Sequence, residues 1–93
     1  MQSTVAEEKK LERTLKALGN RRRLAILKFL KREKQAPVGE IAETIRLSFK
    51  ATSKHLGILA TADIVDREQQ SLQVFYFLSD AMPAVARHVI STL

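Results

Sequence analysis

The residues of this chain best suited to chemistry lie in the stretch SFKATSKHLGILAT, residues 48 to 61. If the stretch is helical, Lys50, Ser53 and Lys54 fall on one side and present two cations and a hydroxyl group. Such groups donate hydrogen bonds to phosphate oxygens and base edges, and the major groove of DNA is wide enough to admit a helix. The other side suits a protein core, since it carries Thr52, Leu56 and Leu59. The spacing therefore predicts a helix with one packed face and one face for duplex DNA.

The residues on and beside the lysine-bearing face also admit roles that involve no DNA. Lys50 and Lys54 also have the spacing of an ordinary solvated pair on a helix, which needs no ligand. Phe49 could stack on a thymine methyl group or a sugar, or it could pack under a neighbouring hairpin. His55 lies beside the core side, where we expect a hydrogen bond to the backbone. Ser48 is a suitable N-cap.

A second group of cations, Arg21, Arg22 and Arg23, falls in the first turn of a predicted helix. Cations at this end oppose the helix dipole, which favours anions there. The arrangement therefore favours contacts of Arg21 and Arg22 with DNA phosphates. Arg23 could instead be held by an internal acid such as Glu43.

Composition narrows the classes of function. The 93 residues fit one domain, residues 1–93, and the formal charge of +6 would attract a polyanion, either nucleic acid or an anionic membrane. A basic protein without such a ligand is the alternative. The absence of cysteine excludes disulfides and thiolate sites, and with two histidines and no glycine-rich phosphate loop we expect no enzyme activity. No apolar run is long enough for a membrane span and no signal segment is visible, so we expect a cytoplasmic protein.

Periodicity and caps predict mostly helices. Thr4 and Glu7 have the spacing of a capping box, Asn20 can cap a second helix, and Pro37 introduces a third. A tight turn then leads to the N-cap Ser48, as in a helix-turn-helix. The expected helices span about 4–18, 20–34, 38–46 and 48–61.

The rest of the chain predicts a hairpin and a last helix. Strand-like segments at 64–68 and 72–78, separated by a turn at 69–71, form a wing over residues 64–78. Its expected tip, residues 66–70, is nearly neutral and leaves Arg67 and Gln70 as contacts. Ser79 or Asp80 is expected to cap a helix over 80–92. The predicted fold is a winged helix-turn-helix of order α-α-α-α-β-β-α, mainly α with a β-hairpin.

The run from residue 18 to 78, with the three residues before it, resembles the ArsR-type winged helix-turn-helix repressors in its motifs. They read LKALGN, RRLAIL, GEIAETI, LSFKATSKHLGIL and VFYFL, in the order typical of that family. The resemblance implies a homodimer that binds operator DNA and blocks transcription until a signal releases it. The inducer stays unknown.

The chain departs from this family at its metal sites. Many members carry Cys-x-Cys at the start of the third helix, where Pro37 and Gly39 align and cannot ligate metal. A second family site uses Asp and His pairs on the last helix, where this chain offers Asp80 and a lone His88. We therefore expect no metal and no cofactor, with His88 at the surface or an interface.

The sequence thus predicts a homodimeric, sequence-specific regulator, most simply a repressor, that binds a palindromic operator in double-stranded DNA. The alternative is a winged-helix module for protein interaction or assembly that binds no nucleic acid. The expected DNA-binding residues are Ser48, Phe49, Lys50, Ser53, Lys54, His55, Arg21, Arg22, Arg67 and Gln70. The first and last helices would form the dimer seam, through Leu11, Leu15, Met82, Val85, Val89 and Leu93.

Overall fold

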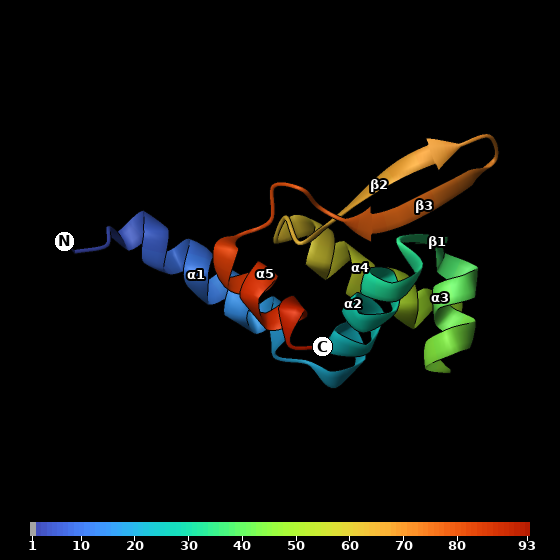
Figure 1. Ribbon diagram of the computed structural model, residues 1–93, viewed down its shortest axis with the longest axis horizontal. Helices are drawn as coiled ribbons and strands as arrows, with labels where there is room; N and C mark the ends of the chain where they lie inside the picture. The colour runs from blue at the N-terminus through green and yellow to red at the C-terminus, as the bar shows by residue number, and fades with distance from the viewer. Residues whose placement is uncertain (1) are drawn as a thin grey trace.

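The computed structural model of the protein describes residues 2–93. This part of the chain forms five helices and a three-stranded antiparallel sheet (Figure 1). The elements are α1 (Val5–Leu18), α2 (Arg21–Glu33), β1 (Gln35–Pro37), α3 (Val38–Ile45), α4 (Phe49–Thr61), β2 (Val65–Gln70), β3 (Gln73–Leu78) and α5 (Ala84–Ser91). The predicted winged helix-turn-helix fold is confirmed.

Side-chain caps explain where α1, α2 and α4 begin. Thr4 accepts the backbone N–H of Glu7 at 3.1 Å, and the Glu7 carboxylate accepts that of Thr4 at 2.9 Å, which completes the expected capping box. The hydrogen bond from the Thr4 backbone N–H to the carboxylate, followed by the interaction with the Thr4 side chain, lowers the pKa of Glu7 below its ordinary value. Asn20 and Ser48 accept backbone N–H groups in the same way at the starts of α2 and α4. All three helices therefore begin directly after the capping residues that the sequence predicted.

The sheet contains a strand, β1, that the sequence analysis missed. β1 pairs antiparallel with β3, with Ala36 opposite Tyr76, so the strand order is β1-β3-β2. Pro37 is the last residue of β1 as well as the N-cap residue of α3. A three-residue strand is too short to show a period of two, and its pairing partner lies far along the chain.

The hairpin turn lies further along the chain than predicted. β2 and β3 pair as far as Gln70 opposite Gln73, so Ser71 and Leu72 form a two-residue turn. Ser71 has a positive φ of 60°, as such turns require at one or both central positions. The predicted turn at 69–71 is wrong because the strand pairing continues through its first two residues.

The last helix begins at Ala84, and the predicted start near residue 80 is wrong. Pro83 is the N-cap residue of α5. A proline ring disfavours helical backbone at the residue before it, so the helix cannot extend back through Met82. Ser79 does accept the backbone N–H of Ala81 at 3.1 Å, but this bond closes a turn ahead of the helix.

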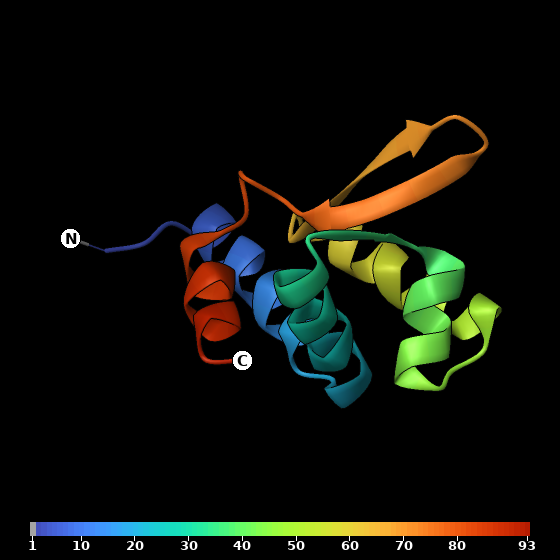
Figure 2. The same cartoon turned by 45° about the vertical axis from the view of Figure 1, so that its right-hand side comes forward.

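The core lies among the helices, with α2 in contact with the four others. Its largest fully buried side chains include residues of α2, α3 and α4 together with Ile64 before β2. The wing projects from one side of this helical body, and the start of α1 extends from the opposite end (Figures 1 and 2). The fold therefore presents a rigid α4 together with a hairpin that reaches beyond the core.

Candidate nucleic-acid interface

The turn between α3 and α4 sets the direction of α4. Arg46 follows α3 with a left-handed φ of 57°, and the N–H of Leu47 donates to the carbonyl of Ala42 at 3.0 Å. Ser48 then caps α4 by accepting the N–H of Ala51 at 3.1 Å. Since each residue of the turn has a defined backbone role, α4 is held at a fixed angle to α3.

The two faces of α4 differ as the spacing predicted. Thr52, Leu56 and Leu59 are each 0% exposed and pack into the core. Lys50, Ser53 and Lys54 are exposed on the other face. No side chain among residues 2–93 forms an ion pair with either lysine. The cations of α4 are therefore available to an external anion.

His55 lies at the edge of this face and contacts a side chain rather than the backbone. Its Nδ1 is 3.1 Å from a terminal guanidinium nitrogen of Arg23, which can only donate, so Nδ1 is the acceptor and the imidazole is neutral. Burial of the ring, followed by the charges of Arg23, Arg22 and Lys54, lowers the pKa of His55 below its ordinary value. His55 is therefore a neutral hydrogen-bond acceptor that holds Arg23.

Arg23 connects three helices, and no acid among residues 2–93 forms an ion pair with it. Its Nε donates to the carbonyl of Ala17 at 2.7 Å and its second terminal nitrogen to that of Lys16 at 3.2 Å. These carbonyls belong to the last turn of α1, where backbone acceptors lack partners within the helix. The suggested pairing with Glu43 is wrong, because the guanidinium is occupied by the end of α1 and by His55.

Arg21 and Arg22 lie at the exposed start of α2. Asn20 occupies two backbone N–H groups of this turn, which leaves the arginine side chains as its cationic donors. Arg22 makes one long hydrogen bond of 3.5 Å to the carbonyl of Ile45, at the end of α3. Both side chains remain within reach of solvent.

The wing residues are arranged differently from the prediction. Arg67 is exposed in β2, not at a hairpin tip, and residues 66–70 all lie within the strand. Gln70 is half-buried and donates to the side chain of Gln35 in β1 at 3.1 Å. Phe49 is 63% exposed and lines a groove together with Arg67 and Leu72, so it lies beside the wing while remaining open to solvent.

The residues predicted for the dimer seam lie on two adjacent helices and differ in exposure. Leu11 and Leu15 are 46% and 50% exposed on α1. On and after α5, Val85, Val89 and Leu93 are half-buried. Met82 is 8% exposed and belongs to the core of the protein itself. Met82 therefore offers little surface, whereas the two leucines of α1 offer much.

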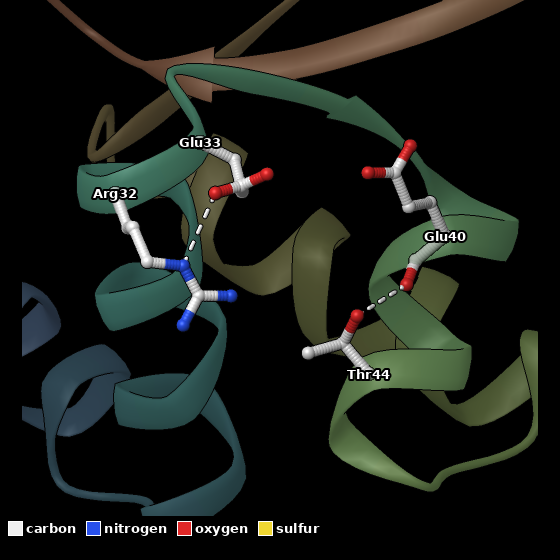
Figure 3. Close-up of polar contacts among 4 residues, drawn as sticks. All are labelled: Arg32, Glu33, Glu40 and Thr44. Carbon is white, nitrogen blue, oxygen red and sulfur yellow. Dashed lines mark hydrogen bonds and ion pairs between the residues drawn. The ribbon is translucent and has the colours of Figure 1, made fainter.

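Two acidic residues, Glu33 and Glu40, lie on α2 and α3. Glu33 at the end of α2 pairs with Arg32 at 3.1 Å, and Glu40 on α3 accepts the hydroxyl of Thr44 with its backbone carbonyl (Figure 3). Arg32 also lies over the ring of Phe29, 5.4 Å from its centroid. These contacts involve neither lysine of α4.

Two further properties of the described residues concern metal binding and membrane crossing. No group of three or more His, Cys, Asp or Glu side chains within residues 2–93 is arranged to hold a metal ion. His88 is exposed on α5. None of the helices in this range combines the length and the apolar character that crossing a membrane demands.

The sequence of the chain matches a known protein family and a known relative. A family model described as a helix-turn-helix domain matches residues 18–68, more than half of the chain. The transcriptional activator HlyU of Vibrio cholerae is 40% identical over 65 residues, which is 70% of this chain and 59% of that protein. The matched stretch therefore spans less than two thirds of the length of HlyU.

Several solved structures have a similar fold over nearly the whole length of this chain. HlyU from Vibrio cholerae has a TM-score of 0.80 at 31% identity, covering 96% of this chain and 92% of that one. NolR from Sinorhizobium fredii has a TM-score of 0.80 at 26% identity, covering 99% and 92%. Mb0332 from Mycobacterium bovis, described as a homodimeric winged helix-turn-helix domain of a possible ArsR-family regulator, shares the fold with a TM-score of 0.83 at 24% identity, covering 98% and 82%.

The chain belongs to the ArsR-type winged helix-turn-helix regulators. In this ArsR-type chain, most of the residues predicted on α4, the start of α2 and the wing are exposed, whereas His55 and Gln70 are half-buried. The structure also reveals the contact between Arg23 and His55, which lie 32 positions apart in the sequence. No local spacing could have indicated that contact. The exposure of Leu72 could have been predicted from the sequence, because Leu72 directly follows the three polar residues of the predicted turn at 69–71.

Proposed function

We propose that the protein is a homodimer that binds a palindromic operator in double-stranded DNA, with α4 of each copy in a major groove. The observation that supports this most directly is the division of α4 into a fully buried face and an exposed face with unpaired cations. A helix held in this way can enter a groove without rearrangement of the protein. The buried face supplies the rigidity and the exposed face supplies the contacts.

The contacts divide by chemistry. Lys50 and Lys54 would bind phosphates, joined by Arg21 and Arg22 from the start of α2. Ser53 and Phe49 would contact base edges or a thymine methyl group. Ser48 and His55 would act by position, since Ser48 caps α4 and His55 holds Arg23. The wing would add Arg67 and Gln70.

The dimer would close through α1 and α5, which contact each other within one copy. Support comes from the exposed leucines of α1, because apolar side chains at helical spacing form a seam suited to another helix. In a twofold dimer the two copies of α4 would enter successive major grooves, about one helical turn of DNA apart. The twofold symmetry of the dimer would require a palindromic operator, and the distance between the two copies of α4 would set the spacing of its half-sites.

We propose that binding to the operator represses transcription. Because the operator lies on the chromosome, we also propose that the protein is cytoplasmic. HlyU is named an activator, and activation needs the same DNA contact. A reporter whose promoter overlaps the selected operator should lose transcription when the protein is expressed. Increased transcription would overturn repression and leave the proposed DNA binding intact.

Selection of bound duplexes from a random pool tests the proposal most directly. We expect a recovered palindrome whose half-sites are spaced by about one helical turn, and an affinity that falls steeply with salt. A pool without enrichment, together with no salt-dependent retardation of duplex DNA, would favour the protein-interaction module instead.

A further inference from the structure

A surface groove lies between α1 and α4, and most of its lining residues take no part in the proposed DNA contacts. Its volume is about 640 Å³, within the range of roughly 300 to 1,000 Å³ that is common for small-molecule sites. It lies beside the DNA-binding face of α4, because Lys54 lines it. A ligand in this groove would therefore touch α4 directly.

The floor of the groove is apolar and open. Ile58 is 37% exposed there, although α4 buries its leucines completely, and Ala17 of α1 lies nearby. Gly57 adds no side chain, and a Cβ at this position would meet no atom within 4 Å. The space directly over Gly57 is thus free of the protein's own atoms.

The rim of the groove is cationic. Arg13 and Lys54 line it and form no ion pair with any carboxylate among residues 2–93, whereas Lys16 pairs loosely with Glu12 at 3.9 Å. Glu12 is the single acid among the lining residues, opposite four bases that also include Arg23. An apolar floor beside unpaired cations matches an organic anion with an apolar body.

We propose that this groove binds an organic carboxylate with an apolar body, and that the bound ligand releases the protein from DNA. The second part rests on the proposed function. A DNA backbone would use the cations but would leave the apolar floor unfilled, so the lining fits a small amphipathic anion better. A carboxylate paired with Lys54 removes that cation from phosphate, which gives the ligand and DNA opposing effects on each other's binding.

Direct binding is measured without DNA, with decanoate as the probe and the full chain labelled with ¹⁵N. We expect amide shifts at residues 12–17 and 54–61. Ile58→Gln should weaken decanoate binding about tenfold because the apolar floor is lost. Arg13→Gln should weaken it as well. The matched control is Val5→Gln, which changes another exposed apolar residue outside the groove and should leave the affinity unchanged.

Two outcomes of the direct measurement would overturn the site. The first is a set of shifts centred on Leu11 and Leu15 instead of the groove. The second is equal affinity for decanoate in wild type and Ile58→Gln, with both proteins folded by their spectra.

The link to DNA is measured separately by anisotropy on the selected operator. Saturating decanoate should lower DNA affinity about tenfold, and operator DNA should lower decanoate affinity by the same factor. Without decanoate, Arg13→Gln and Ile58→Gln should bind DNA as wild type does. A weaker and less salt-dependent DNA affinity in Arg13→Gln would assign Arg13 to the DNA backbone and overturn its assignment to the ligand alone. Absence of DNA binding in wild type would overturn the proposed function and the release from DNA, while the decanoate measurement still decides the site.

Discussion

The helix α4 and the wing lie beside each other, yet their exposed residues differ in kind. The exposed face of α4 carries Lys50 and Lys54 without an acid. On β2, Arg67 lies between two acids, and the turn ends in Leu72, which is 96% exposed. In the proposed complex, the difference would concentrate charge-dependent affinity on α4, while the wing would offer contacts with little net charge. The following variants test this contrast, from the largest expected effect to the smallest.

Removal of one cation from α4 should have the largest effect. Lys54→Ala should lower DNA affinity about tenfold and reduce the slope of log affinity against log salt by about one, because one phosphate contact is lost. Anisotropy titrations over a series of salt concentrations measure both quantities. Lys28→Ala is the matched control, since Lys28 is exposed on α2 and outside the proposed contacts. An unchanged slope in Lys54→Ala would contradict the assignment of this face.

The buried side of α4 can be improved without touching its exposed side. The hydroxyl of Thr52 is buried and has no partner among residues 2–93. Thr52→Val should raise the free energy of unfolding by about 1 kcal/mol, because an unsatisfied polar group is replaced by a methyl group of similar size. The melting temperature should rise by roughly 4 to 8 °C. A lower melting temperature would show that the hydroxyl is satisfied in solution.

On the wing, the matching substitution should do less than on α4. Arg67→Ala should weaken DNA binding by about two- to threefold, since the side chain is exposed and solvent screens its charge. The same salt series used for Lys54→Ala gives the comparison. A loss equal to that of Lys54→Ala would remove the proposed contrast between helix and wing.

The smallest effect should come from the pH dependence of His55. Its pKa is lowered in the folded protein, so folding favours the neutral ring. This contribution to stability is complete above about pH 6.5 and is lost progressively as the pH falls below that value towards the folded pKa. Urea denaturation between pH 7 and pH 5 should show a smaller loss of stability in His55→Gln than in wild type. Parallel curves would show that His55 titrates normally.

The elements that could be predicted are those specified by neighbouring residues. The capping box at Thr4, the caps Asn20 and Ser48, and the two faces of α4 all depend on spacings of a few residues. The fold class followed from the order of these segments, and the family motifs agreed with it.

The features that could not be predicted depend on distant partners or on backbone effects. β1 exists because it pairs with β3 some forty residues later, and Arg23 finds His55 only once α2 and α4 are packed. The start of α5 depends on Pro83, which disfavours helical backbone at the residue before it, so the helix begins after the predicted caps Ser79 and Asp80. The position of the hairpin turn had no glycine to mark it. Which exposed residues meet DNA depends on a partner outside the chain, so that assignment stays a proposal.

The contacts of the Arg23 guanidinium bear on the distance between the two half-sites of the operator. It clamps the end of α1 to α4, and in a dimer closed through α1 it would couple the subunit contact to the angle of the inserted helix. The contacts of Arg23 within each subunit, which do not involve DNA, would then determine the length of the operator spacer. A chain with a looser side chain at position 23 should accept spacers of several lengths.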